Sequence, residues 1–134
     1  MKSKYVLLAS VLLISVATFA QKDQIKAAEK ALKGGKSQEA VTILAEAESL
    51  IANASDAEKA QFFFVKGNAL LDLANKKVST DTNLSLAAKA YQDLIDVEKA
   101  SGKGKYSAQA AASVTDIKFK LINAAIADSK IDKH

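Results

Sequence analysis

The stretch from Gln61 to Ala74, QFFFVKGNALLDLA, decides the fold of this chain. Four consecutive apolar residues, Phe62 to Val65, occupy every side of a helical turn, and three leucines follow between residues 70 and 73. A helix that is apolar on all sides has to be covered on more than one side. We therefore expect a central helix with other helices packed around it.

The start and the middle of this helix carry separate signals. Ser55 and Glu58 have the spacing of a capping box, so the helix is expected to run from Asp56 to about Lys76. Gly67 lies in its middle, where glycine costs roughly 1 kcal/mol relative to alanine. The expected compensation is the close approach of a neighbouring helix over the missing side chain.

Four further segments have apolar residues at helical spacing and none shows sustained alternation, so the sequence predicts helices and no strand. These segments cover about residues 23–33, 37–53, 84–100 and 107–128. The breaks fall at Gly34-Gly35, at residues 75–82 and at the linker 101–105, SGKGK. Ser37 is expected to cap the second helix. The predicted fold class is all-α, an antiparallel array of helix hairpins with about five helices.

Residues 1–20 have the features of a secretory signal peptide. Lys2 and Lys4 precede an apolar run over residues 5–17, which is shorter than the roughly 20 residues of a membrane span. Cleavage is expected between Ala20 and Gln21, which leaves a helical domain at residues 21–134 without a stable membrane span. We expect this domain in the periplasm or outside the cell, associated with the cell envelope. The alternative is an uncut N-terminal membrane anchor.

The composition argues against nucleic acid and against catalysis. All nineteen basic residues are Lys, so the guanidinium group that best binds phosphate and guanine is missing. The chain has no Cys, and its only His is the last residue, His134. Thiol nucleophiles, thiolate metal ligands and a well-placed imidazole base are therefore missing. We expect a protein that is not an enzyme, with no cofactor, no metal and no nucleic-acid partner.

Five residues resemble the tetratricopeptide signature. Phe63, Gly67 and Leu70 match its aromatic residue, glycine and following large residue, and Ala87 and Tyr91 match its later alanine and aromatic residue. In such repeats small residues stand where two helices cross closely, and large residues fill the spaces between crossings. The resemblance covers roughly residues 23–128 and implies a tetratricopeptide-like α-solenoid, with Phe63, Gly67, Ala87 and Tyr91 as packing positions.

Several features depart from the family pattern. Lys66 stands where the family usually has Leu, and Ala28 replaces the glycine in the first helix. Gly67 and Ala87 are further apart than the two helices of a repeat of about 34 residues allow, so residues 75–82 would be an insertion. The sequence thus predicts two irregular repeats with an additional helix. An unrelated array of α-hairpins is the alternative.

The resemblance implies a concave groove, lined by the first helix of each repeat, that binds a protein or peptide segment. Its expected lining is Gln61, Phe64, Asn68, Leu71 and Asp72 from the central helix, and Ile25, Glu29 and Lys33 from the first helix. For Phe64 and Leu71, burial in the core is the alternative. The first hypothesis for function is a non-catalytic exported scaffold. The second is a small helical carrier that encloses an apolar ligand between walls of phenylalanine.

The last predicted helix has two apolar faces. The first face holds Val114, Ile117, Leu121 and Ala125, and the second holds Phe119, Ile122 and Ile126. Together they span about 200° of the helix, which is more than one neighbouring pair of helices can cover. We therefore expect the second face to contact another molecule or further repeats.

Overall fold

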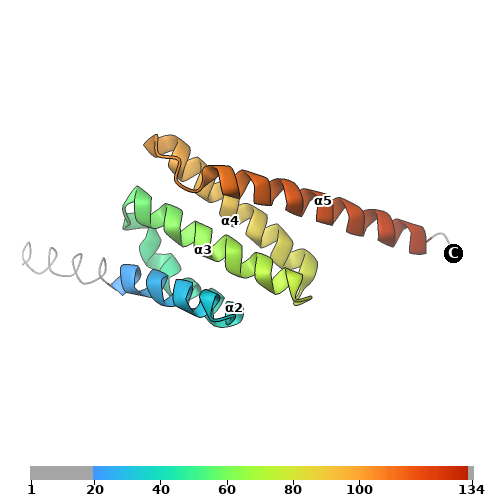
Figure 1. The fold of residues 1–134 in the computed structure, drawn as a ribbon, viewed down its shortest axis with the longest axis horizontal. Coiled ribbons are helices and arrows are strands. Elements are labelled where there is room, and N and C mark those ends of the chain that lie inside the picture. The colour runs from blue at the N-terminus through green and yellow to red at the C-terminus, as the bar shows by residue number, and fades with distance from the viewer. Residues whose placement is uncertain (1–19, 133–134) are drawn as a thin grey trace, which may run out of the picture.

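A computed structural model describes residues 20–132, and every regular element in this range is a helix. Residues 20–33 form the N-terminal helix. It is followed by α2 (Ser37–Ala47), the 3-10 helix η1 (Glu48–Asn53), α3 (Asp56–Asn75), α4 (Thr80–Ser101) and α5 (Ser107–Ile131). Consecutive α-helices run in opposite directions along the molecule (Figure 1). The predicted all-α class is confirmed. The predicted signal peptide, apart from residue 20, lies outside the described residues.

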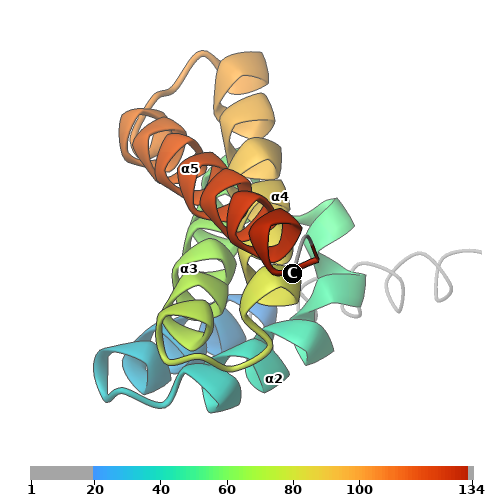
Figure 2. The ribbon, with the colours of Figure 1, turned by 90° about the vertical axis from the view of Figure 1, so that its right-hand side faces the viewer.

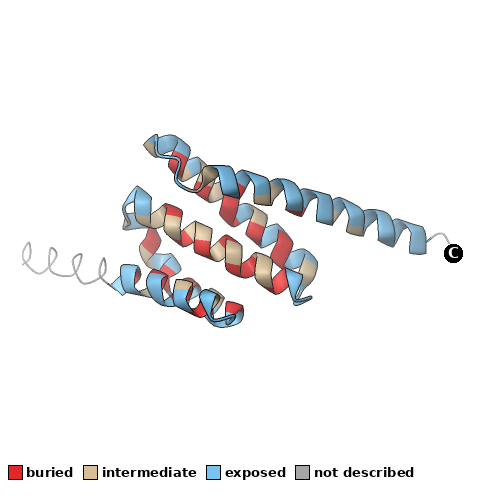
Figure 3. Cartoon of the chain, in the orientation of Figure 1, coloured by how far each residue is buried: buried red, intermediate tan, exposed pale blue. Residues whose placement is uncertain are grey.

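α3 is the element that two hydrophobic clusters share. Phe62, Val65 and Ala69 pack against the N-terminal helix, α2 and η1. Leu70 and Ala74 pack against α4 and α5. Buried and half-buried positions follow α3 along its length, whereas α5 is mostly exposed (Figure 3). The helix with the most evenly apolar sequence is therefore the one with neighbours on opposite sides.

α5 lies over α3 and α4, on the far side of the molecule from the N-terminal helix and α2 (Figure 2). Only two of its residues, Ala110 and Ile117, are buried. Its C-terminal half projects beyond the ends of the other helices (Figure 1). The part of α5 after Ile117 thus leaves most of its side chains in solvent.

The start of α3 has the predicted cap. The backbone N–H of Glu58 donates to Ser55 Oγ at 3.2 Å, and the backbone N–H of Ser55 donates to Glu58 Oε2 at 3.3 Å. Both bonds of the capping box are present, so two of the free donors at this helix end are satisfied.

The prediction that Ser37 caps α2 is wrong. Lys36 occupies the cap position, and its side chain makes no capping hydrogen bond. Ser37 is instead buried, and its hydroxyl donates to the carboxylate of Asp72 on α3. The Ser37 hydroxyl therefore makes a tertiary hydrogen bond instead of capping its own helix.

The loop predicted over residues 75–82 is shorter than expected. α3 ends at Asn75 and α4 already begins at Thr80. The side chain of Asn83 is buried and donates to the carbonyl of Val78 at 2.8 Å, which ties the first turn of α4 to the preceding loop. The predicted insertion between the two helices is therefore a four-residue turn, and the extra length lies in the helices.

Gly67 lies against the aromatic ring of Tyr91 on α4. A Cβ atom added to Gly67 would be 2.6 Å from Cε1 of that ring. Tyr91 is fully buried, and its hydroxyl donates to Asn68 Oδ1 at 2.6 Å. Burial also raises the pKa of Tyr91 to about 12, so the hydroxyl stays protonated and able to donate. The close neighbour expected at Gly67 is thus a side chain and not a backbone.

Gly67→Ala should lower the melting temperature, although alanine is the better helix former. The gain in helix propensity is about 1 kcal/mol, whereas overpacking against a fixed ring costs roughly 1–3 kcal/mol. Thermal denaturation followed by circular dichroism measures the balance. In a Tyr91→Leu background the ring is gone, so the same substitution should raise the melting temperature. An increase in the wild-type background would contradict the predicted clash.

Candidate functional site

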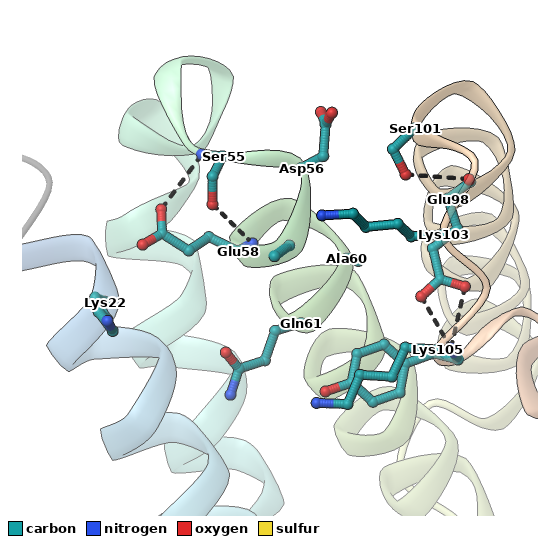
Figure 4. A pocket seen from close by; sticks show the side chains of 12 residues that line it. Lys22, Ser55, Asp56, Glu58, Ala60, Gln61, Glu98, Ser101, Lys103 and Lys105 are labelled. Atoms are coloured by element: carbon teal, nitrogen blue, oxygen red, sulfur yellow. Dashed lines mark hydrogen bonds between the residues drawn. The ribbon is translucent and has the colours of Figure 1, made fainter.

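A cavity of about 390 Å³ opens where the N-terminal helix, the start of α3 and the loop from α4 to α5 meet (Figure 4). The N-terminal helix contributes Lys22. The start of α3 and the residue before it contribute Ser55, Asp56, Ala57, Glu58, Ala60 and Gln61. The end of α4 and the following loop contribute Glu98, Ser101, Lys103, Lys105 and Tyr106. Three segments that are far apart in the sequence therefore form one site.

The carboxylate of Glu58 is held in the wall of the cavity. In addition to its bond from the Ser55 backbone, it accepts a hydrogen bond from Gln21 Nε2 at 2.9 Å. This contact joins the N-terminal helix to the start of α3. Glu58 is thus already engaged with two groups of the chain itself.

Glu98 is a second wall carboxylate, and it is only 4% exposed. It accepts hydrogen bonds from the backbone N–H groups of Tyr106 and Ser107, at 2.8–3.0 Å, and from the Ser107 hydroxyl. Burial alone would raise the pKa of Glu98, but these hydrogen bonds outweigh it and hold the pKa below its ordinary value. The carboxylate therefore stays ionised and fastens the first turn of α5 to the end of α4.

Three lysines around the cavity, Lys22, Lys103 and Lys105, form no ion pair within residues 20–132. The side chain of Lys103 extends toward the start of α3, as Figure 4 shows. Lys105 Nζ lies 5.0 Å from the centre of the Tyr106 ring. Asp56 likewise makes no ion pair in this part of the chain. The cavity thus has three ammonium groups and three carboxylates without a charged partner in residues 20–132, and two of those carboxylates, Glu58 and Glu98, are held by neutral hydrogen-bond donors.

Tyr106 lines the cavity, and the ring of Phe64 supports it from behind. The rings of Phe64 and Tyr106 stack at 4.4 Å between centroids, with 18° between their planes. The stack joins α3 to the residue before α5, and it places an apolar surface next to the ammonium groups of the loop. Such a surface can contact an apolar side chain while the lysines bind a carboxylate.

Of the five residues of α3 predicted to bind a partner, only Gln61 lines this cavity. Its Nε2 donates to Glu29 Oε2 on the N-terminal helix, at 3.4 Å. Phe64 lies behind the site, in the stack with Tyr106. Leu71 is half-buried against the cluster shared with α4 and α5.

Asn68 and Asp72, also predicted to bind a partner, are engaged within the chain. Asn68 accepts the hydrogen bond from Tyr91. Asp72 accepts one from Ser37 and forms an ion pair with Lys76 at 2.7 Å. The hydrogen bond from Lys76, followed by that from Ser37, holds the pKa of Asp72 below its ordinary value. The structure therefore does not bring these two residues to the cavity.

The remaining predicted residues fall into three groups. Ile25 is buried in the core, and Glu29 forms an exposed ion pair with Lys33 at 3.4 Å. Among the packing positions, Ala87 and Tyr91 are fully buried, Gly67 is buried and Phe63 is half-buried between the two clusters. Phe119, Ile122 and Ile126 lie on α5, far along the chain from the cavity, and are exposed.

Sequence reasoning missed Lys22, Lys103, Lys105 and Tyr106. The segment 101–105 was assigned as a linker because of its glycines, although its two lysines next to a tyrosine were a usable signal. No local pattern relates this segment to Lys22. Their convergence depends on the packing of the helices between them.

No phenylalanine lines this cavity or a second one of about 340 Å³ between the start of α4 and α5. Within residues 20–132, no cluster of three or more His, Cys, Asp or Glu side chains could hold a metal ion. None of the helices in that range has both the length and the apolar character needed to cross a bilayer.

No protein-family model matches the chain, and neither curated proteins nor solved structures give a significant match.

Proposed function

We propose that this protein is a non-catalytic, exported helical scaffold that binds a carboxylate-bearing segment of a protein or peptide in the cavity between the N-terminal helix, α3 and the α4–α5 loop. The observation that carries the proposal is the set of three ammonium groups around that cavity that form no ion pair with any other residue of the range 20–132. The scaffold acts in the periplasm or at the cell envelope, after residues 1–20 have been removed.

The formal charges of the site balance, three lysines against three carboxylates, but the hydrogen bonds of the carboxylates support an acidic ligand. Two of its three carboxylates, Glu58 and Glu98, already accept hydrogen bonds from the chain. Asp56 is the one carboxylate without such hydrogen bonds, whereas Lys22, Lys103 and Lys105 form no ion pair within residues 20–132. A carboxylate-bearing segment would supply the missing partners, and an apolar side chain next to it would contact the Tyr106 ring.

Three features of the fold support a tetratricopeptide-like arrangement. The helices alternate in direction along the chain (Figure 1). Gly67 on α3 lies against Tyr91 on α4, as expected for a close crossing within one repeat. The cavity lies between the N-terminal helix and α3, which would be the first helices of two successive repeats. The resemblance implies a ligand-binding groove lined by these first helices, and Gln61 is the residue of that expected lining on α3 that also lines the cavity.

Cleavage after Ala20 would add a further positive charge to the site. Gln21 is buried, and its side-chain amide donates a hydrogen bond to Glu58 in the cavity wall. A new α-amino group on Gln21 would therefore lie close to Lys22. This placement suits a protein that acquires its binding site fully only after export.

Neutralising the three cavity lysines should weaken binding of an acidic peptide by roughly 3- to 150-fold, since each exposed ion pair contributes about 0.2–1 kcal/mol. The protein is purified from an exporting host. The probe is a fluorescent peptide of alternating Glu and Leu, and fluorescence anisotropy compares the wild type with the Lys22→Gln, Lys103→Gln, Lys105→Gln variant. Added salt should weaken the wild-type complex, because exposed charges are screened.

A matched variant changes Lys26, Lys30 and Lys99 to Gln. These lysines are exposed and lie outside the cavity, so the total charge changes equally while the site is left intact. This variant should bind as the wild type does. Equal loss in both triple variants, or equal binding of a Gln-Leu peptide, would show that the cavity does not select an acidic segment.

A further inference from the structure

An apolar stripe lies on the outer side of α5, independent of the cavity. Phe119, Ile122 and Ile126 are 63%, 54% and 48% exposed. At 100° per residue they lie on the side of the helix opposite Ile117, which is fully buried against α4. The stripe begins where α5 still faces the turn between α3 and α4, since Lys120 donates to Asn75 there, and it continues onto the part of α5 that projects beyond the other helices (Figure 1). A second helix could therefore lie along it without displacing any element of the fold.

The stripe has the spacing of a coiled-coil seam. Steps of four and three residues alternate along Thr115, Phe119, Ile122, Ile126 and Ser129. Six residues flank the stripe, and four of them are charged, two on each side. One flank holds Asp116, Asn123 and Lys130, and the other holds Lys118, Ala125 and Asp132. All six flanking residues are exposed.

We propose that α5 pairs with α5 of a second copy of this chain, in antiparallel orientation, about a two-fold axis next to Asn123 and Ala125. In this register Ile122 packs against Ile126 of the second copy. Asp116 faces Lys130 of the second copy, and Lys118 faces Asp132 of the second copy. Each contact occurs twice because the two-fold axis makes the interface self-complementary.

Charge complementarity favours this arrangement over a parallel one. In a parallel pair, each residue on one flank would face the residue five positions later on the other flank of the second helix. Lys118 would then face Asn123, and Ala125 would face Lys130, so no opposite charges would meet. In the antiparallel register each flank has negative charge at one end and positive charge at the other, and reversing the second helix brings opposite signs together.

The rest of the fold leaves room for this pair. The residues from Thr115 to Asp132 span about 27 Å of helix. The other helices pack on the opposite side of α5 and mostly on its N-terminal half, so the bodies of the two copies lie at opposite ends of the pair. Asp116 also pairs with Lys120 of its own helix at 2.9 Å, but it is 58% exposed and has a free side for a second cation.

Charge reversal tests both the partner and the register. Asp116→Lys places like charges opposite Lys130 twice, and Lys130→Asp does the same opposite Asp116. Each single variant should raise the dissociation constant roughly tenfold or more. The double variant Asp116→Lys, Lys130→Asp restores opposite charges and should dimerise as the wild type does. The two positions lie about 21 Å apart on one helix, so restoration requires contact between copies.

Analytical ultracentrifugation of protein purified from an exporting host gives the measurement, and circular dichroism shows that each variant is helical. Asp128→Lys is the matched control, because Asp128 is exposed on the same helix but lies off the stripe. It should leave the dimer unchanged. A wild type that stays monomeric at high concentration would overturn the proposal. A double variant as dissociated as the single variants would overturn the antiparallel register.

Discussion

Phe62→Ala is expected to lower the free energy of unfolding by about 3–5 kcal/mol, the largest effect of any single substitution considered for this protein. Phe62 is fully buried and packs among Ile25, Leu44 and other residues of the N-terminal helix, α2 and η1. The edge of its ring meets Phe63 at 5.4 Å between centroids. Alanine would leave a cavity between helices that cannot close without losing their other contacts.

The three consecutive phenylalanines provide their own controls. Phe63 and Phe64 are half-buried, so each loses less contact area when it is replaced by Ala. Equilibrium denaturation should rank Phe62→Ala well above Phe63→Ala and Phe64→Ala in lost stability. Equal losses at the three positions would contradict an orientation of α3 in which Phe62 is buried and Phe63 and Phe64 are half-buried.

Glu98→Gln is expected to have the next largest effect, a loss of about 2–3 kcal/mol at pH 7. The carboxylate accepts hydrogen bonds from two backbone N–H groups and one hydroxyl at the first turn of α5. An amide keeps a single acceptor oxygen and brings an NH2 group that has no acceptor among these partners. The substitution also removes a negative charge from the positive end of the helix dipole.

The effect of Glu98 should depend on pH in a defined direction. Its folded pKa lies below the ordinary value of 4.5, so the ionised carboxylate stabilises the fold fully above that value. As the pH falls, the unfolded state takes up the proton first, and this stabilisation is lost as the pH falls through the folded pKa. The stability difference between wild type and Glu98→Gln should therefore shrink as the pH falls below the ordinary pKa of the carboxyl group and through the lower folded pKa.

Denaturant titrations at several pH values measure this difference. Asp72 also has a lowered pKa, but it is present in both proteins and cancels in the comparison. Glu46→Gln is the control, since Glu46 is exposed on α2 and forms no ion pair within residues 20–132. A difference between wild type and Glu98→Gln that is constant over the pH range would contradict the role assigned to the carboxylate.

Local sequence was sufficient to predict the helices and the central place of α3. The period of apolar residues gave the helical segments, because i, i+3 and i+4 positions share a face whatever surrounds them. The capping box at Ser55 and Glu58 gave the start of α3 for a similar reason, since both of its bonds lie within four residues. The apolar second face of α5 was also visible in the sequence, and it is exposed in the fold.

The tertiary structure decided which residues of the same type are buried, which partners they bond to and which of them reach the cavity. Phe62, Phe63 and Phe64 are identical in type, and only the positions of the neighbouring helices bury the first and leave the others half-covered. Ser37 has the residue type of a cap, but it bonds to Asp72, which is 35 positions away. Lys22 and Lys103 meet at one cavity although most of the chain lies between them. Periodicity and capping act within a few residues, whereas these contacts depend on the packing of helices that no local pattern encodes.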